Sequence, residues 1–220
     1  MYNLKKEFKP KRNICNGYLK RRKVSNMYLV GIDPGASGAI CILNEDGTIH
    51  SVEDMPLIIT KTETRKKAPK GSKTKTVKTV KESKEVDAKT LSTIIPEASI
   101  TLLEKVGAMP GQGVTSMFSF GETYGSIKSI ASIKSEKLLL VRPNEWQKYF
   151  GLTMSKKDKE GMSKGAVTKL HKSNIANKVL ELYPDARESL TGARGGLKDG
   201  RADAIMIARY LFEDLQTKRN

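Results

Sequence analysis

An acidic residue ends the first apolar run of the chain, and glycines follow it closely. Residues 28–32 have the composition of a buried strand, Asp33 ends that run, and Gly35 and Gly38 come shortly after it. A carboxylate at the end of a buried strand lies at the open edge of a sheet. Glycines beside it let a large charged group approach the backbone. This segment therefore predicts a site for a metal ion or a phosphate.

Three further acids lie near the ends of other predicted elements. Glu104 closes an apolar run within 99–106, while Asp199 and Asp203 begin the helical segment 199–215. Residues four apart share one face of a helix. Taken singly, each acid has a structural alternative, such as an Asx turn, an N-cap or a surface ion pair. Together they favour a divalent cation, because buried carboxylates need compensation and oxygen ligands suit Mg²⁺ or Mn²⁺. The predicted metal ligands are Asp33, Glu104, Asp199 and Asp203.

The elements that must position these acids alternate along the chain. Strands are predicted at 28–33, 38–44, 48–55, 99–106 and 137–142, with a hairpin turn at 46–47. Helices are predicted at 86–96, 115–133, 173–183 and 199–215, with a helical turn after Pro143. Three strands in sequence followed by alternating helices and strands predict an α/β fold. Its sheet would be mixed and five-stranded, with three antiparallel strands, then parallel strands, and helices on both faces.

The positive charge is concentrated in two segments. The net charge is +16, and residues 1–27 carry nine basic and one acidic side chain. Residues 61–84 carry ten basic and two acidic side chains, so the rest of the chain is balanced. Cationic segments neutralise phosphates and release counterions, which favours a nucleic-acid partner. The alternative is that these lysine runs are solvated and only aid solubility.

One globular domain is expected over residues 27–215. A disordered basic arm would precede it at 1–26, a flexible basic loop would interrupt it at 57–86, and a tail would follow at 216–220. No run approaches the length of a membrane span, and the first residues lack the apolar region of a secretory signal. The two cysteines lack metal-binding spacing and suit a reducing compartment. We therefore expect a cytoplasmic or nucleoid-associated protein with no membrane partner.

The acidic segments resemble RuvC-type Holliday junction resolvases, members of the ribonuclease H-like superfamily. The resemblance rests on residues 31–40, on Glu104 and on residues 199–204; residues 115–125 are most similar to the phage and plant-chloroplast branches. It implies a ribonuclease H-like fold and a homodimer that binds four-way DNA junctions. It also implies paired symmetric nicks in opposed strands, two Mg²⁺ ions per active site and no small-molecule substrate.

The resemblance also implies roles for individual residues. Asp33, Glu104 and Asp203 match acidic positions of the family, whose helix acids tend to be three residues apart. Here the three-apart position is Gly200, so either Asp199 or an acid from elsewhere supplies the fourth ligand. Lysines near the scissile phosphate correspond to Lys172, expected to be catalytic, and Lys148, expected to contact DNA.

Further DNA contacts are expected at the glycine-rich turn and the helix that follows it. Gly113 would let backbone N–H groups approach the DNA. Phe118 and Phe120 would stack against unpaired bases. Their alternative is that one of the two lies in the core, since residues two apart on a helix do not share a face. Trp146 is expected to pack against the fifth strand.

Three other functions fit parts of the pattern. An ATP-binding protein of the actin or sugar-kinase type also opens with a strand and an aspartate, but the chain lacks a second phosphate loop and an adenosine motif. A non-catalytic nucleic-acid-binding protein would need only the cationic segments. A nuclease for flaps or replication forks would keep the chemistry and change the substrate.

Overall fold

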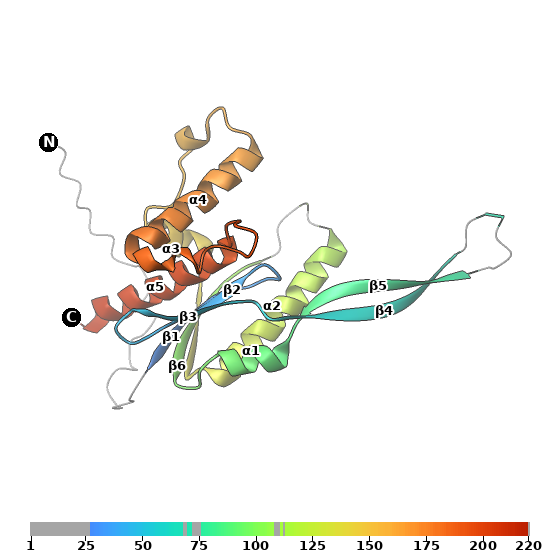
Figure 1. Cartoon of the computed structure of the whole chain (residues 1–220), viewed down its shortest axis with the longest axis horizontal. Coiled ribbons are helices and arrows are strands. Elements are labelled where there is room, and N and C mark those ends of the chain that lie inside the picture. Colours follow the sequence, from blue (N-terminus) through green and yellow to red (C-terminus); the bar gives the residue numbers. More distant parts are fainter. Residues whose placement is uncertain (1–26, 68–69, 72–75, 108–110, 112, 220) are drawn as a thin grey trace.

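A mixed five-stranded sheet forms the centre of the protein (Figure 1). Its strands are β1 (Tyr28–Asp33), β2 (Ala39–Leu43), β3 (Ile49–Asp54), β6 (Ser99–Glu104) and β7 (Lys137–Val141). The spatial order is β3-β2-β1-β6-β7, with β1 to β3 antiparallel and with β6 parallel to both β1 and β7. The predicted mixed five-stranded sheet, with three antiparallel strands and then parallel strands, is confirmed.

The structure, a computed structural model, describes most of the chain from Met27 onward. The described residues are 27–67, 70–71, 76–107, 111 and 113–219. The basic arm predicted at 1–26 lies outside them. No helix in these described ranges is long and apolar enough to cross a membrane.

Helices cover both faces of the sheet (Figure 1). One face carries α1 (Ala88–Ile94) and α2 (Val114–Lys134). The other carries α3 (Pro143–Tyr149), α4 (Lys164–Leu182) and α5 (Asp199–Arg219), and two short 3₁₀ helices lie at Lys157–Lys159 and Pro184–Arg187. Because side chains alternate along a strand, β1 contributes Val30 and Ile32 to the first core and Leu29 to the second.

Helix α5 lies directly against β1. Its residues from Ala204 to Ala208 are all fully buried, as expected for a helical stretch in which every residue is apolar. The close approach depends on Gly31, because a Cβ there would lie 2.3 Å from the backbone nitrogen of Ala208 and 2.5 Å from the carbonyl oxygen of Ala204. The distance between strand and helix is thus set by backbone contact.

The prediction of a flexible loop at 57–86 is wrong. Strands β4 (Leu57–Lys67) and β5 (Thr76–Val86) pair as an antiparallel ribbon that projects from the body (Figure 1). The segment lacks an apolar alternation because both faces of the ribbon are solvated. Its strand character comes from β-branched threonines and valines, whose side chains favour extended backbone.

Two helices are longer than predicted. Helix α4 begins at Lys164 rather than at residue 173, because the Ser163 hydroxyl accepts a hydrogen bond from the backbone N–H of Ala166 and caps it. The polar first half of α4 lacks a buried face and so lacks apolar periodicity. Helix α5 continues through most of the tail predicted at 216–220, where Lys218 pairs with Asp214 one turn earlier.

Candidate active site

Two acids occupy equivalent positions at the ends of neighbouring parallel strands. Ile32 of β1 pairs with Leu103 of β6, so Asp33 and Glu104 are the next residues on adjacent strands. Strand alternation turns both side chains towards the α5 face, since Leu102, two residues before Glu104, packs in the core on that side. Asp33 is partly buried and Glu104 is buried. The fold therefore places these two strand-end carboxylates on adjacent strands, at the same edge of the sheet.

The first turns of α5 add the other two acids. Asp199 and Asp203 are both partly buried and lie one turn apart on this helix. Between them, Gly200 packs so tightly on the β1–β2 turn that a Cβ would lie 2.2 Å from the carbonyl oxygen of Ser37. A side chain at position 200 would collide with this turn. The steric contact explains why the earlier helix acid stands at 199, four residues before Asp203, and not three.

The four carboxylates are coupled electrostatically. Burial, followed by the charges of Asp203, Glu104 and Asp199, raises the pKa of Asp33 to about 8. Burial and the charges of Glu104 and Asp199 raise the pKa of Asp203 to about 7. Lys172 lowers both values, though by less than the acids raise them. The site therefore has an excess of negative charge that protons or a cation must neutralise near neutral pH.

Two residues outside the acidic set hold its members in place. Lys172 of α4 forms an ion pair with Asp199. The indole Nε1 of Trp146, in α3, donates a hydrogen bond to Oε1 of Glu104 at 2.8 Å. Burial raises the pKa of Glu104, and this hydrogen bond opposes the rise by favouring the carboxylate.

The contact between Trp146 and Glu104 was missed from the sequence, where only a packing role was predicted for Trp146. Packing is confirmed, since Trp146 is 1% exposed. The available signal was chemical, because a buried indole N–H requires an acceptor. Tyr124 of α2 was also missed. Its pKa is raised by burial and then by the charge of Glu104, so it lies within electrostatic range of the site.

The donor chemistry of this site fits a hard divalent cation, because it consists of carboxylate oxygens that repel one another. In the described ranges, no three acidic, histidine or cysteine side chains lie close enough together to hold a metal ion as they stand. Two of the four acids are turned to other partners, Asp199 to Lys172 and Glu104 to Trp146. Binding of a cation would require side-chain rotation at strand and helix ends that are already adjacent.

The residues predicted to contact DNA are more scattered. The ring of Phe120 lies near the β1–β2 turn, 3.8 Å from where a Cβ on Gly35 would stand. Phe118 is 67% exposed, and Gly113 is the N-cap of α2. The alternative that one phenylalanine lies in the core is wrong, because neither belongs to a core cluster and the first half of α2 extends beyond the sheet. Lys148 is exposed in the last turn of α3.

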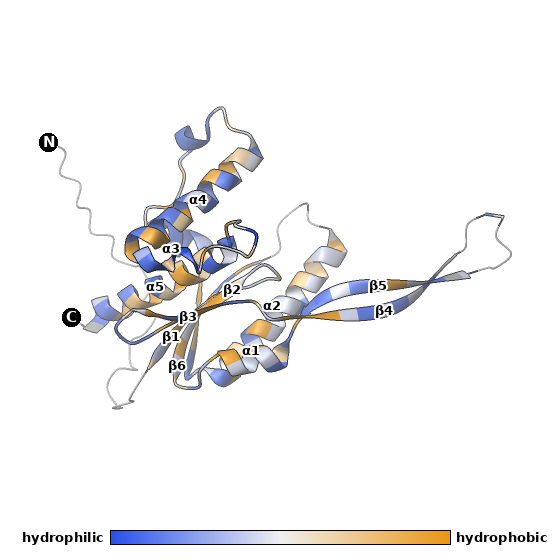
Figure 2. Ribbon diagram, in the orientation of Figure 1, coloured by the Kyte–Doolittle hydropathy of each residue, from blue (hydrophilic) through white to orange (hydrophobic). Residues whose placement is uncertain are grey.

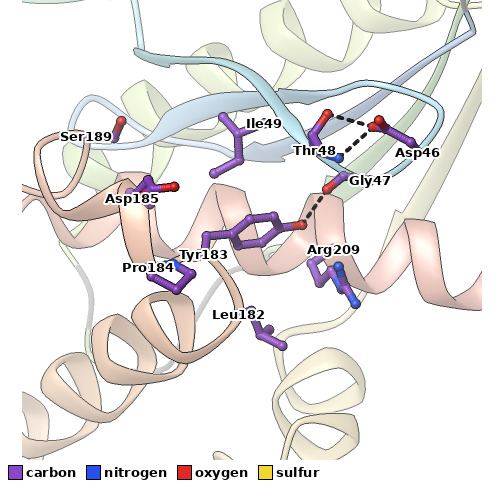
Figure 3. Close-up of a pocket in the computed structure, with 11 residues that line it drawn as sticks. Asp46, Gly47, Thr48, Ile49, Leu182, Tyr183, Pro184, Asp185, Ser189 and Arg209 are labelled. Carbon is purple, nitrogen blue, oxygen red and sulfur yellow. Dashed lines mark hydrogen bonds between the residues drawn. The ribbon is translucent and has the colours of Figure 1, made fainter.

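The pocket drawn in Figure 3 lies at the other end of the sheet. Its volume is ≈ 590 Å³, and its lining comes from the β2–β3 turn, residues 182–186, Ser189 and Arg209. Tyr183 donates a hydrogen bond to the carbonyl oxygen of Gly47 across it, at 2.9 Å. Because Leu29 and not Asp33 pairs with the end of β2 that leads into this turn, the pocket is remote from the carboxylates.

No protein-family model and no curated protein sequence matches the chain. Among solved structures, Thermus thermophilus RuvC superposes with a TM-score of 0.38 and 10% sequence identity, over 88% of this chain and 97% of that chain. T. thermophilus RuvC in complex with Holliday junction substrate superposes with a TM-score of 0.36 and 12% identity, over 87% of this chain and 96% of that chain. At these TM-scores and identities, neither likeness assigns a function to this chain.

Proposed function

We propose that the protein is a metal-dependent endonuclease that hydrolyses phosphodiester bonds in branched DNA, with the four-way junction as its preferred substrate. One observation carries this proposal: four carboxylates from β1, β6 and α5 share one sheet edge, where burial, followed by the charges of the other three acids, raises the pKa of Asp33 to about 8. Structural carboxylates are normally paired with cations or exposed to solvent. An excess of buried negative charge at a sheet edge is what a cation-dependent phosphate site requires.

Each residue has a defined place in this proposal. Asp33, Glu104, Asp199 and Asp203 would hold two Mg²⁺ ions, or Mn²⁺. When bound, such ions supply the activation of water and the stabilisation of the leaving oxygen. Lys172 reaches the same edge from α4 and would donate hydrogen bonds to a non-bridging phosphate oxygen, where negative charge develops. Trp146 would keep Glu104 ionised and oriented.

The choice of substrate follows from charge and from the sequence resemblance. The cationic segments at 1–27 and 61–84 favour a polyanion, and the resemblance at residues 31–40 and 199–204 favours four-way junctions. From residues 115–125, the prediction remains that the protein is most similar to the phage and plant-chloroplast branches of these resolvases. Paired nicks require two active sites, so the proposal includes a homodimer. Size-exclusion chromatography with light scattering tests that part separately.

A second candidate is a non-catalytic protein that binds branched DNA. One observation favours it, namely that no three potential ligands in the described part of the chain are gathered closely enough to hold a metal ion. On this alternative the carboxylates would stay protonated or paired with Lys172, and Mg²⁺ would have no effect beyond ionic screening.

The deciding experiment is cleavage of a labelled four-way junction with Mg²⁺ and with EDTA, alongside fork and flap substrates of the same arm sequences. The endonuclease proposal expects Mg²⁺-dependent nicks, fastest and paired on the junction. Faster cleavage of forks or flaps would change the substrate and keep the chemistry. Binding without cleavage in Mg²⁺ or Mn²⁺ would establish the non-catalytic alternative.

A further inference from the structure

The β4–β5 ribbon leaves the body at the edge of the sheet that carries the carboxylates. In the register of the sheet, Asp33 pairs with Ala39 and Ala39 pairs with Asp54, so the end of β3 lies at the same edge as the end of β1. The backbone N–H of Met55 donates to the carbonyl oxygen of Gly38 at 3.0 Å, which fixes the chain just before the ribbon starts. A ligand that lies along the ribbon therefore leads towards the acids.

The base of the ribbon is tied to the body on two sides. Asp54 accepts hydrogen bonds from Lys198 at 3.0 Å and from Arg201 at 2.7 Å, and both donors flank the start of α5. Leu57 and Val86, the first cross-strand pair, pack in the core beneath α1 and α2. These contacts hold the direction of the ribbon relative to the helix that carries Asp203.

The two faces of the ribbon differ in chemistry. One face is a ladder of hydroxyl groups, in which Thr60 contacts Ser83 at 2.7 Å and Thr64 contacts Thr79 at 2.9 Å. These hydroxyl groups form hydrogen bonds with one another, so they do not need a ligand to satisfy them. Figure 2 shows that the ribbon is mostly hydrophilic beyond its base, with isolated apolar positions. We call this the hydroxyl face.

The opposite face, here called the cationic face, carries Lys61, Arg65, Lys78 and Lys84. Glu82 and Glu63 pair with Lys61 at 3.1 Å and Lys78 at 3.5 Å. In the described part of the chain, Arg65 and Lys84 have no carboxylate partner. Arg65 also lies directly opposite Lys78 in the register, and like charges in that position destabilise a strand pair.

Apolar side chains are exposed on the cationic face as well. Ile59 is 62% exposed and Val80 is 60% exposed, and the register places both on this face, whereas the hydroxyl face carries Ile58, which is 44% exposed. A two-stranded ribbon is marginally stable by itself in water, so unrelieved charge and exposed apolar groups on one face are costly to keep. A polyanion with apolar sugar surfaces would relieve both costs.

We infer that the cationic face of the β4–β5 ribbon binds the sugar–phosphate backbone of one duplex arm of the substrate and leads that arm to the carboxylate edge. Each strand has 11 residues, so the ribbon spans about 35 Å at the usual rise per residue, close to one helical turn of B-DNA. The inference rests on the proposed function in taking branched DNA as the ligand. It adds which surface receives the duplex and which face of that surface stays free.

The test uses two lysines of the same strand that point in opposite directions. Lys84 lies on the cationic face and Lys81 on the hydroxyl face, three residues away. Binding of a labelled four-way junction in EDTA is measured over a range of salt concentrations for the full-length protein, for Lys84→Gln, for Arg65→Gln and for the control Lys81→Gln. Each cationic-face substitution should flatten the slope of log K against log salt by about 0.9, and Lys81→Gln should leave it unchanged.

Equal slopes for Lys84→Gln and Lys81→Gln, or an unchanged slope for both cationic-face variants, would overturn the inference. Thermal melts of each variant confirm that the body remains folded. Because binding in EDTA needs no chemistry, the result is independent of cleavage. If the slopes depend on the face but Mg²⁺ supports no cleavage, the ribbon binds DNA and the endonuclease proposal is wrong. If Mg²⁺ supports cleavage but the slopes do not depend on the face, the protein is an endonuclease and the ribbon inference is wrong.

Discussion

The indole nitrogen of Trp146 and the carboxylate of Glu104 form a buried hydrogen bond 2.8 Å long, between residues 42 positions apart in the chain. The bond holds one oxygen of Glu104 in a fixed direction. It also favours the ionised carboxylate in a place where burial favours the protonated form. Helix α3 therefore acts on the site through Glu104 without contributing an acid.

Replacing Trp146 by Phe should keep most of the packing and remove only the donor. We expect weaker Mg²⁺ binding, with about a tenfold higher Mg²⁺ concentration needed for half-maximal cleavage rate, the scale of lost outer-shell hydrogen bonds. Tyr149→Phe is the matched control, because it removes a hydrogen bond from the same helix to Glu213, outside the site. The same Mg²⁺ requirement in both variants would show that Trp146 only packs.

Asp33→Asn should abolish cleavage and preserve binding to junctions. The substitution keeps the shape of the side chain and removes its charge, so the cleavage rate should fall on the order of 1000-fold or more. Junction affinity in EDTA should stay within about threefold of the wild-type value, since the cationic segments supply the affinity. Gel-shift and cleavage assays on one preparation measure both quantities. Cleavage at the wild-type rate would remove Asp33 from the chemistry.

The pH dependence of the metal-free protein follows from the raised carboxyl pKa values. Burial, followed by the neighbouring acids, raises the pKa of Asp33 from 3.8 to about 8 and the pKa of Asp203 from 3.8 to about 7. Between these values the unfolded chain releases protons that the folded protein retains, so the stability of the metal-free protein should fall as pH rises through this window. Denaturant titrations at several pH values measure it. Asp203→Asn, which cannot ionise, should flatten the decline.

Magnesium should bind more tightly as pH rises towards 8. The ion needs ionised carboxylates, and below the raised pKa values it must displace protons from Asp33 and Asp203. Calorimetric titrations at about pH 6 and about pH 8, each in two buffers of different ionisation enthalpy, count the protons released. Affinity that does not change across this range would exclude these carboxyl groups as ligands. Asp46→Asn, at an exposed turn at the far end of the sheet, serves as the control.

Lys172→Gln should slow cleavage more than it weakens binding. The ammonium group pairs with Asp199 and lowers the pKa values of Asp33 and Asp203, so the proposed mechanism assigns it to the reacting phosphate. Loss of a charge-stabilising donor costs about 100-fold in rate. Lys169→Gln removes an exposed lysine one turn earlier on the same helix and should cleave normally. Equal cleavage rates for the two variants would show that Lys172 contributes only surface charge and has no part in the chemistry.

Gly31→Ala tests the contact that sets the distance between β1 and α5. An added Cβ would meet the backbone of α5 at 2.3 Å, so either the helix moves or the fold loses stability by about 1–3 kcal/mol. Gly121→Ala is the control, because a Cβ there meets nothing within 4 Å and alanine favours the helix by about 0.8–1 kcal/mol. Chemical denaturation compares the two. Equal stability of Gly31→Ala and the wild-type protein would contradict the close approach.

The body of the fold could be predicted because its strands have buried faces. Apolar runs identified all five strands of the sheet, and the acids at their ends followed from the strand boundaries. The β4–β5 ribbon could not be found in this way, because neither of its faces is covered beyond Leu57 and Val86, and hydrophobic alternation exists only where one face is buried. The start of α4 at Lys164 was not predicted for the same reason, because the first half of this helix has no buried face.

The predicted acids are neighbours in the structure, but their partners could not be derived from local sequence. Glu104 and Trp146 meet only because β6 and α3 lie side by side in the fold, and Lys172 reaches Asp199 from a different helix. The position of Asp199 depends on the steric contact of Gly200 with the β1–β2 turn. Such contacts depend on tertiary packing, which spacing along one chain does not encode. The catalytic and metal-binding roles of these residues remain predictions for the experiments above.

The two ends of the β4–β5 ribbon are pinned together where they join the body, since Leu57 pairs with Val86 and the N–H of Asp87 donates to the carbonyl oxygen of Pro56 at 2.9 Å. The ribbon therefore leaves and re-enters the body at one place, and only its first cross-strand pair, Leu57 and Val86, packs in the core. A longer or shorter ribbon would change how far the cationic face extends from the body and would leave the carboxylates at the sheet edge unchanged. Under the proposed function, a change to this single stretch of chain would alter which DNA arms the protein accepts while the carboxylates keep their places.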